Sequence, residues 1–237
     1  MRLRFDDERI LAVMAHPDDA ELLCAGTLAR ARSEGAEVGI CVMCNGDKGV
    51  PSGPLIDDLA KVRRSEMADA AKCLQANVLW FDASDGSLFD TLENRRKLIE
   101  IYRQFSPTLV IAHDLCDYHP DHRAASVLAE AATWFCASKG HVTASPALAS
   151  PPALWLADTI NMSGFEPQFF VDVSGQLEIK KQMLGCHRSQ LQRSKDGDFA
   201  PLMDLMLRQA TTRGAQSGVA AAEAFRTHQA FKRTRAW

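Results

Sequence analysis

The 237-residue chain lacks the features that mark several large classes of protein. It has no run of about 18 apolar residues, so we expect no transmembrane helix. It has no excess of basic residues: the formal net charge of -3 argues against a nucleic-acid or membrane-surface partner. Its first ten residues mix Arg with Asp and Glu, and no apolar segment typical of a secretion signal follows them. These absences predict a cytoplasmic protein.

Cysteine is present, but in no pattern of pairs. The seven cysteines are an odd number scattered through the chain, which predicts reduced and mostly buried thiols. Cys41 and Cys44 have the spacing of redox and metal motifs, yet they lie in a predicted strand rather than at the start of a helix. Residues three apart in a strand point to opposite faces of the sheet, so we predict structural thiols here.

What the sequence does contain is an alternation of short apolar runs with helical patterns. Strands are predicted at 9–15, 37–44, 78–81, 108–112, 153–157 and 168–173, and helices at 19–34, 58–75, 91–105, 121–137 and 174–187. This order predicts an α/β fold with a Rossmann-like, mostly parallel sheet and helices on both faces. The length suits one domain over 1–237. Residues 189–237 lack the alternation and are predicted to form a helical C-terminal elaboration.

Two polar motifs interrupt this pattern at the ends of predicted strands. His16-Pro17-Asp18-Asp19 follows the first strand, and His119-Pro120-Asp121-His122 follows the fourth strand and opens a helix. A plain helix cap would need only one acid. Ligands of open α/β sheets bind at the carboxyl ends of the strands, so we expect both motifs to face one site.

Histidine and carboxylate together suit Zn²⁺, which in catalytic sites takes three protein ligands and leaves a fourth position for water. One His and one Asp from the first motif and one His from the second supply that number. The remaining Asp is a candidate general base, and the remaining His can stabilise an oxyanion or protonate a leaving group. The spacing alone does not decide which residue has which role.

With these motifs the sequence resembles the PIG-L/LmbE family of zinc-dependent N-acetylglucosaminyl deacetylases. The shared segments follow the family order over nearly the whole chain: AHPDDAE at 15–21, NGDKG at 45–49, RRSE at 63–66, DG at 85–86, HPDH at 119–122, HRSQ at 187–190 and EAF at 223–225. The resemblance implies three zinc ligands, which are His16, Asp19 and His122. It implies Asp18 as the general base and His119 as an imidazolium that stabilises the oxyanion, or as a proton donor to the amine. It also implies that Arg63 contacts a sugar hydroxyl.

The function implied by the resemblance is removal of an acetyl group from an N-acetylglucosamine-type amino sugar or its conjugate, a small-molecule substrate, by a homo-oligomer. Fe²⁺ and Co²⁺ suit the same ligands as zinc. Two alternatives stay open: an amidase for another N-acyl or thiol-conjugate substrate, and a catalytically silent protein that binds zinc and sugar. A nucleotide-binding Rossmann protein is disfavoured, because acids at the first turn would repel a pyrophosphate.

Several further residues have no role that the sequence decides. Asp85-Gly86 is interpreted as a turn. Glu223 is expected to anchor the C-terminal segment, with an arginine as one candidate partner. The roles of His113, His187 and Arg64 are left open, as is the acyl group that the site prefers.

Overall fold

The computed structural model describes residues 4–51, 56–195 and 201–229. They form a seven-stranded sheet in the order β3-β2-β1-β4-β5-β7-β6. The strands are β1 (Arg9–Met14), β2 (Glu37–Cys44), β3 (Asn77–Ala83), β4 (Leu109–Ala112), β5 (Ala153–Ala157), β6 (Phe169–Asp172) and β7 (Ala222–Thr227). The α-helices are α1 (Asp19–Leu23), α2 (Ala25–Ser33), α3 (Leu59–Lys72), α4 (Leu92–Phe105), α5 (Pro120–Phe135), α6 (Leu177–Gly185), α7 (Arg188–Leu191) and α8 (Leu202–Ser217), and two short 3-10 helices are η1 (Ser174–Gln176) and η2 (Gln192–Lys195).

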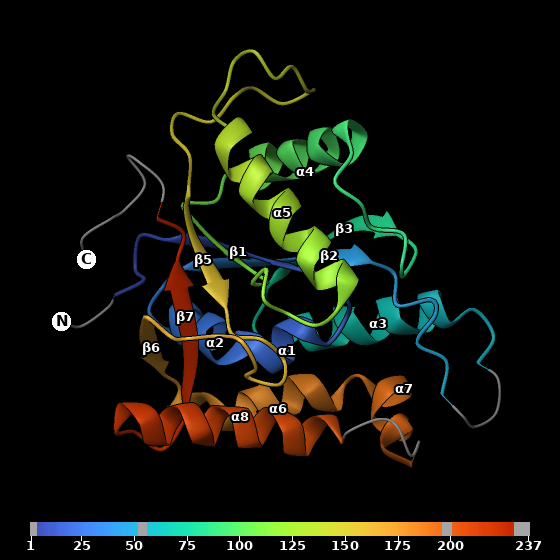
Figure 1. Cartoon of the computed structure of the whole chain (residues 1–237), viewed down its shortest axis with the longest axis vertical. Coiled ribbons are helices and arrows are strands. Elements are labelled where there is room, and N and C mark those ends of the chain that lie inside the picture. The colour runs from blue at the N-terminus through green and yellow to red at the C-terminus, as the bar shows by residue number, and fades with distance from the viewer. Residues whose placement is uncertain (1–3, 52–55, 196–200, 230–237) are drawn as a thin grey trace.

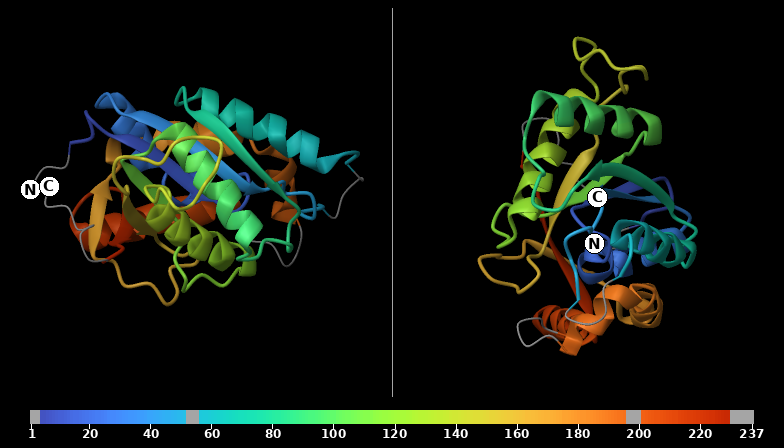
Figure 2. Two further views of the ribbon diagram at one scale, coloured as in Figure 1. Left: turned by 90° about the horizontal axis from the view of Figure 1, so that it is seen from above. Right: turned by 90° about the vertical axis from the view of Figure 1, so that its right-hand side faces the viewer.

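Helices cover both faces of this sheet, in which β1 to β5 run parallel (Figure 1). Alternate residues of β1 point to opposite faces: Leu11 and Val13 belong to the core under α4 and α5, whereas Ala12 and Met14 belong to the core under α2 and α3. Strands buried on both faces need apolar residues at every position, which explains the continuous apolar runs. In Figures 1 and 2, α6 and α8 form a further layer beyond α1 and α2. The predicted α/β fold is thus confirmed.

The helix predicted over 19–34 is divided into α1 and α2 by a buried ion pair. The carboxylate of Glu223 accepts the N–H groups of Gly26, at 2.9 Å, and Thr27, at 2.6 Å, at the start of α2. The Lys180 ammonium pairs with that carboxylate and donates to a main-chain carbonyl oxygen of α1. These charged groups satisfy peptide groups that the break leaves without helical partners. The partner of Glu223 is therefore a lysine, not the arginine considered from the sequence.

The C-terminal region also departs from the prediction. Residues 222–227 form β7, which lies antiparallel between β5 and β6, so this region is not helical throughout. The sequence of β7, AEAFRT, is rich in Ala and Glu, which favour helices when no tertiary contact acts. Pairing with two strands decides the structure of such a segment, and local composition does not reveal it. Helices α7 and α8 agree with the helical expectation for this region.

All seven cysteines are free, and Cys41 and Cys44 are buried. Both thiols belong to the same apolar cluster rather than to opposite faces, and the register between β2 and β3 shifts between Val42 and Cys44. Their burial without pairing agrees with structural thiols.

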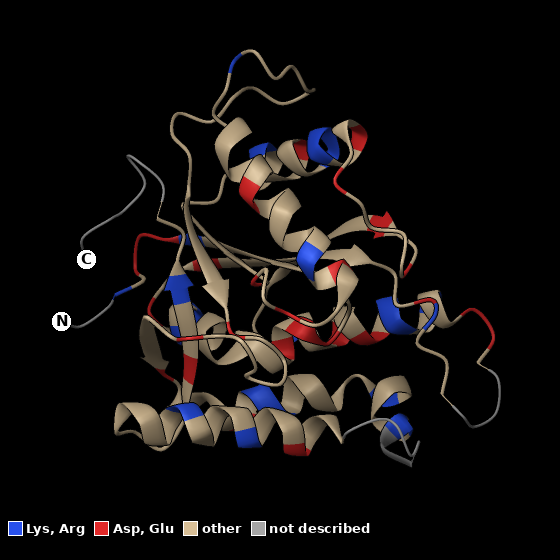
Figure 3. Cartoon of the chain, viewed as in Figure 1, with Lys and Arg blue, Asp and Glu red and all other residues tan. Residues whose placement is uncertain are grey.

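Charge on the described part of the chain is dispersed. In Figure 3, Lys and Arg residues lie on many elements and do not gather on one face of this view. Among the described helices, none is both long enough and apolar enough to cross a membrane.

Candidate active site

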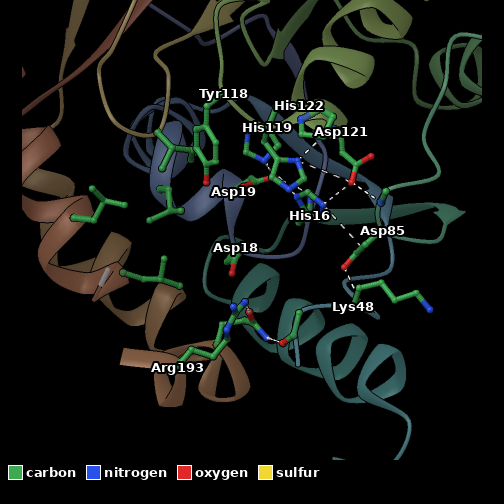
Figure 4. Close-up of a pocket in the computed structure, with 18 of the residues that line it drawn as sticks. His16, Asp18, Asp19, Lys48, Asp85, Tyr118, His119, Asp121, His122 and Arg193 are labelled. Carbon is green, nitrogen blue, oxygen red and sulfur yellow. Dashed lines mark hydrogen bonds and ion pairs between the residues drawn. The ribbon is translucent and has the colours of Figure 1, made fainter. Parts of the chain in front are cut away.

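The two polar motifs meet where the order of the parallel strands reverses. β1 lies between β2 and β4, so the chain leaves the carboxyl ends of β1 and β4 side by side. Such a switch point opens a crevice in which α/β proteins bind ligands. This crevice contains a cavity of about 670 Å³, lined in part by residues 118–122 and by His16, Asp18, Asp19 and Leu22 (Figure 4).

His16, Asp19 and His122 each bring one ligand atom to a common point in this cavity. Nδ1 of His16 lies 3.3 Å from Nε2 of His122 and 3.4 Å from Oδ2 of Asp19. The third side of the triangle, between Oδ2 of Asp19 and Nε2 of His122, is 3.3 Å. In a tetrahedral zinc site with bonds of about 2.0–2.1 Å, two ligand atoms lie about 3.3–3.4 Å apart. The side chains therefore have the spacing that a small divalent cation requires.

Two further carboxylates orient the imidazoles of this triangle. Nε2 of His16 lies 3.2 Å from Oδ2 of Asp121, and Nδ1 of His122 lies 3.0 Å from Oδ1 of Asp117. Each ring can direct its other nitrogen at a cation, as histidine ligands in metal sites do. Burial alone would lower the pKa of both rings, but the carboxylates, including Asp19, raise it to about 10 for His16 and about 9 for His122.

His113, whose role the sequence left open, is a buried neighbour of the triangle. Its ring stacks on that of His122 with centroids 4.0 Å apart, and its Nε2 accepts the N–H of Ala15 at 3.0 Å. That hydrogen bond occupies the nitrogen closest to Asp19, so His113 is less suited than His16 to hold a cation. Burial lowers its pKa to about 4, and the neutral ring packs behind the site.

Asp18 stands beside the triangle with its backbone in the left-handed region, at φ 106° and ψ -21°. A residue other than glycine rarely adopts this conformation, and strained backbone of this kind clusters at functional sites. The Arg63 guanidinium holds it in place by donating to Oδ2 of Asp18, at 3.1 Å, and to the carbonyl oxygen of Pro17. Burial raises the pKa of Asp18 to about 6, although Arg63 opposes the rise. Such a carboxylate can accept a proton near neutral pH.

Arg63 lines the cavity, but the guanidinium hydrogen bonds that the structure shows go to protein oxygen atoms. Its Nη1 donates to the carbonyl oxygen of Gly46 at 3.3 Å. A Cβ at Gly46 would lie 2.5 Å from Nη1, and its φ of +72° also favours glycine. Gly46, in the NGDKG segment, thus leaves room for the Arg63 guanidinium, which connects this loop to Asp18 through hydrogen bonds to both. A contact between Arg63 and substrate stays a prediction.

His119 caps the first turn of α5. Its Nδ1 accepts the N–H of Asp121 at 3.2 Å, which leaves Nε2 as the protonated nitrogen of the neutral ring. Burial, together with the neighbouring His16 and His122, lowers the pKa of His119. The structure therefore favours a neutral ring over the imidazolium considered from the sequence, and Nε2–H can still donate to an oxyanion.

Asp85 and Gly86, interpreted from the sequence as a turn, connect three loops around the site. The Asp85 carboxylate accepts the N–H groups of Gly46, at 2.8 Å, and Lys48, at 3.1 Å. The N–H of Gly86 donates to Oδ2 of Asp121 at 2.8 Å. The sequence did hold a signal for this role, because the pair follows β3 at the edge of the sheet where both histidine motifs lie.

His187 and Arg64 both lie outside the cavity lining. His187 forms a fully buried pair with Glu21, with 3.4 Å between Nε2 and Oε1. It precedes α7, where the N–H and hydroxyl of Ser189 donate to the carboxylate of Glu66. Arg64 pairs with an exposed aspartate and lies over the ring of Trp80. Both therefore support neighbouring elements.

The cavity has two unlike walls that sequence reasoning did not find. Figure 4 shows Lys48 and Asp85 on the far side of His16 from Tyr118, with Arg193 beyond Asp18. The polar wall consists of Lys48, Asp85, Gln190 and Arg193, and the aliphatic wall of Leu22, Ile160, Leu202 and Leu205. Because these residues come from segments far apart in the chain, no local sequence pattern predicts that they line one cavity.

Comparisons with known proteins find deacetylases and a hydratase among the relatives of this chain. The chain is 27% identical over 194 residues to the diacetylchitobiose deacetylase of Thermococcus kodakarensis, which covers 78% of this chain and 71% of that protein. It is 25% identical over 188 residues to the 4-oxalmesaconate hydratase of Pseudomonas putida, covering 76% and 73%. The solved N,N'-diacetylchitobiose deacetylase of Pyrococcus horikoshii has a TM-score of 0.83 and 26% identity, covering 94% of this chain and 85% of that chain.

A family assignment rests on more than these single relatives. Residues 11–133, more than half of the chain, match the family described as "PIG-L: GlcNAc-PI de-N-acetylase". The matched range contains both histidine motifs, Arg63 and the segment at 85–86. The chain therefore belongs to the PIG-L family.

Proposed function

We propose that this protein is a metal-dependent hydrolase that removes the acetyl group from an N-acetylated amino sugar or its conjugate. The observation that carries the proposal is the triangle of His16, Asp19 and His122, with side lengths of 3.3 to 3.4 Å and with Asp18 and His119 beside it. The two relatives named as diacetylchitobiose deacetylases support an amide of an amino sugar as the substrate.

We propose zinc as the ion and His16, Asp19 and His122 as the residues that would hold it. When bound, Zn²⁺ supplies a Lewis acid that polarises the amide carbonyl and lowers the pKa of a water molecule to about 7. Two imidazoles and one carboxylate leave a net positive charge at the ion, which suits a developing oxyanion. Fe²⁺ and Co²⁺ suit the same ligands, so metal analysis of the purified protein decides the identity.

The side chains around this position perform the proton transfers. The Asp18 carboxylate, held by Arg63, accepts a proton from the attacking water. The Nε2–H of His119 donates to the carbonyl oxygen as negative charge develops there. When the C–N bond breaks, Asp18 passes the proton that it took from the water to the nitrogen, so that acetate and a free amine leave.

The test is to measure acetate and amine release from N-acetylglucosamine, diacetylchitobiose and N-acetylglucosaminyl conjugates. Native, chelated, zinc-restored and Asp18→Asn protein are compared. We expect release that requires zinc and is lost in Asp18→Asn, while that variant keeps its metal. Loss of metal from Asp18→Asn would instead make Asp18 a ligand.

A hydratase is the second candidate, because one relative carries that name. Hydration of a carbon–carbon double bond could use the same Asp18 but would release no amine. An unsaturated tricarboxylic acid, followed by its ultraviolet absorbance, is therefore assayed in parallel. Turnover of that acid without amine release from any sugar would contradict the proposed deacetylase.

We also propose a cytoplasmic homo-oligomer. Free cysteines suit a reducing compartment. Several large apolar side chains are exposed on loops near the carboxyl edge of the sheet, which suits a contact between copies; they include Phe89, Leu115 and Tyr118. Light scattering coupled to gel filtration tests the oligomeric state.

A further inference from the structure

We propose that this site takes N-acyl chains longer than acetyl and hydrolyses them faster than the acetyl amide. The inference rests on the proposed amide hydrolysis and assigns its acyl group. It is carried by the aliphatic wall of the cavity, which consists of Leu22, Ile160, Leu202 and Leu205.

The aliphatic wall begins beside the candidate metal ligands. Leu22 follows Asp19 by three residues in α1, so the two side chains lie on the same face of the helix, and both line the cavity. The N–H of Ile160 donates to Oδ2 of Asp117 at 3.2 Å, and Asp117 is the carboxylate that orients His122. Two of the four aliphatic residues thus lie next to a candidate ligand or to the carboxylate beside it.

From there the wall continues onto α8. Leu202 and Leu205 are three residues apart at the start of this helix and therefore share one face. Helix α8 packs against α1, which joins the two halves of the wall. In Figure 4 the late helices, drawn in brown, lie across the cavity from the histidine cluster. The wall is a strip of aliphatic side chains that leads away from the reacting atoms.

The position of this strip favours the acyl group over the sugar as its occupant. The carbonyl carbon must lie between Asp18 and the metal ligands, because water attacks it there. The acyl chain begins one bond from that carbon, whereas an aglycone begins several bonds further away. Sugar hydroxyls need hydrogen-bonding partners, and these are on the other wall, at Lys48, Asp85 and Gln190.

An acetyl group offers only a single methyl to this strip. A chain with several methylene groups would pack its own apolar surface against these side chains and remove it from water, which is favourable. Each methylene that becomes fully buried increases the affinity up to about fourfold. The geometry therefore points to a medium-length aliphatic acyl chain on the amino-sugar nitrogen.

The experiment compares kcat/KM of the zinc-loaded protein for N-acetyl-, N-butanoyl-, N-hexanoyl- and N-octanoylglucosamine. We expect an increase of at least tenfold from acetyl to hexanoyl. A second readout is the binding of the product acids by calorimetry, where hexanoate should bind more tightly than acetate by a similar factor. This measurement does not depend on turnover.

Two variants of α8 locate the effect. Leu205→Gln should lower the ratio of kcat/KM between hexanoyl and acetyl substrates to near one. Leu207→Gln is the matched control, because Leu207 is half-buried on the same helix and does not line the cavity. It should keep the ratio of the wild-type protein, and circular dichroism and zinc content show whether each variant is folded.

The outcomes separate this inference from the proposed function. Hydrolysis of the acetyl substrate without a gain for longer chains overturns the acyl assignment and leaves the deacetylase standing. A gain that Leu205→Gln retains shows that the aliphatic wall does not bind the chain, and it overturns the inference as well. Failure of the zinc-loaded protein to hydrolyse any N-acylglucosamine overturns the inference, and if diacetylchitobiose and the N-acetylglucosaminyl conjugates are also left intact, the proposed deacetylase is overturned as well.

Discussion

Asp18 and Asp19 are neighbours in the chain, yet their surroundings shift the pKa values of the two carboxyl groups in opposite directions. Burial raises the pKa of both, but His122, His113 and His16 hold the pKa of Asp19 well below its usual range. For Asp18 the largest opposing effect is that of Arg63, and its pKa still rises to about 6. Carboxylates whose environments separate their pKa values in this way are typical of an acid–base residue next to a permanently ionised one.

Asp121 contributes to metal affinity without belonging to the triangle. The Asp121→Asn substitution removes the carboxylate that orients His16, and we expect zinc affinity to fall about 10- to 100-fold. Competition with a chromophoric chelator measures this change. Asp90→Asn is the control, since Asp90 pairs with Arg95 on the surface. Equal affinity of Asp121→Asn and wild-type protein would show that His16 needs no such partner.

Arg63 is predicted to be a positioning residue for Asp18. Lysine cannot reproduce a planar guanidinium that reaches Asp18 and two carbonyl oxygens, so Arg63→Lys should lower kcat at least tenfold. Zinc content and KM should change little, because the metal ligands are untouched. The neighbouring Arg64→Lys, at an exposed position, should keep wild-type kcat. A rise in KM with unchanged kcat would instead favour the sugar contact that the sequence suggested.

At the scale of elements, the sequence predicted what is local and missed what depends on distant partners. The parallel strands were predictable because burial on both faces leaves continuous apolar runs. The break between α1 and α2 was not, because Glu223, which accepts the N–H of Gly26, is 197 residues away. The same distance explains β7, whose helix-favouring composition is overridden by two partner strands.

The buried pair of Glu223 and Lys180 should make a large contribution to the stability of this region. Glu223→Gln leaves the Lys180 ammonium buried without a counter-charge, and we expect unfolding to require about 3–5 kcal/mol less free energy. Urea denaturation measures the difference. Glu178→Gln, which breaks a surface pair with Lys181, should cost at most about 1 kcal/mol. If both variants lose a similar amount of unfolding free energy, burial of the ion pair does not determine its contribution to stability.

Two glycines in helices should respond oppositely to replacement by alanine. A Cβ at Gly214 in α8 would lie 2.7 Å from the Cα of Ala221, and main-chain atoms cannot move aside, so Gly214→Ala should destabilise by about 1–3 kcal/mol. A Cβ at Gly185 in α6 would meet nothing within 4 Å, and Gly185→Ala should stabilise by about 0.4–1 kcal/mol. Thermal unfolding of both variants checks the signs, and a stable Gly214→Ala would show that α8 can shift away from β7.

At the scale of the whole molecule, the candidate site was predictable only where its residues are neighbours in the chain. HPDD and HPDH are each a run of four consecutive residues, and each follows the end of a parallel strand. The topology therefore predicted that the two motifs would lie close together. The walls of the cavity had no such signal, because Lys48, Gln190 and Leu205 come from separate segments. Of the orienting carboxylates, Asp121 belongs to HPDH itself and Asp117 lies in the loop before it, and their roles became distinguishable only through their distances to the rings.

The same topology predicts that metal binding stabilises the whole fold. His16 and His122 are 106 residues apart, so the unfolded chain does not present the site and the ion binds the native state. At a free zinc concentration 100 times Kd, the free energy of unfolding should rise by about 2.7 kcal/mol, with a higher Tm. Thermal scans with zinc, with chelator and with Mg²⁺ measure this, and Mg²⁺ should have little effect because it prefers oxygen ligands. His122→Ala should lose the zinc-dependent shift. If it keeps the full shift, zinc stabilises the protein through other groups, such as the exposed thiol of Cys116, and the triangle is not the metal site.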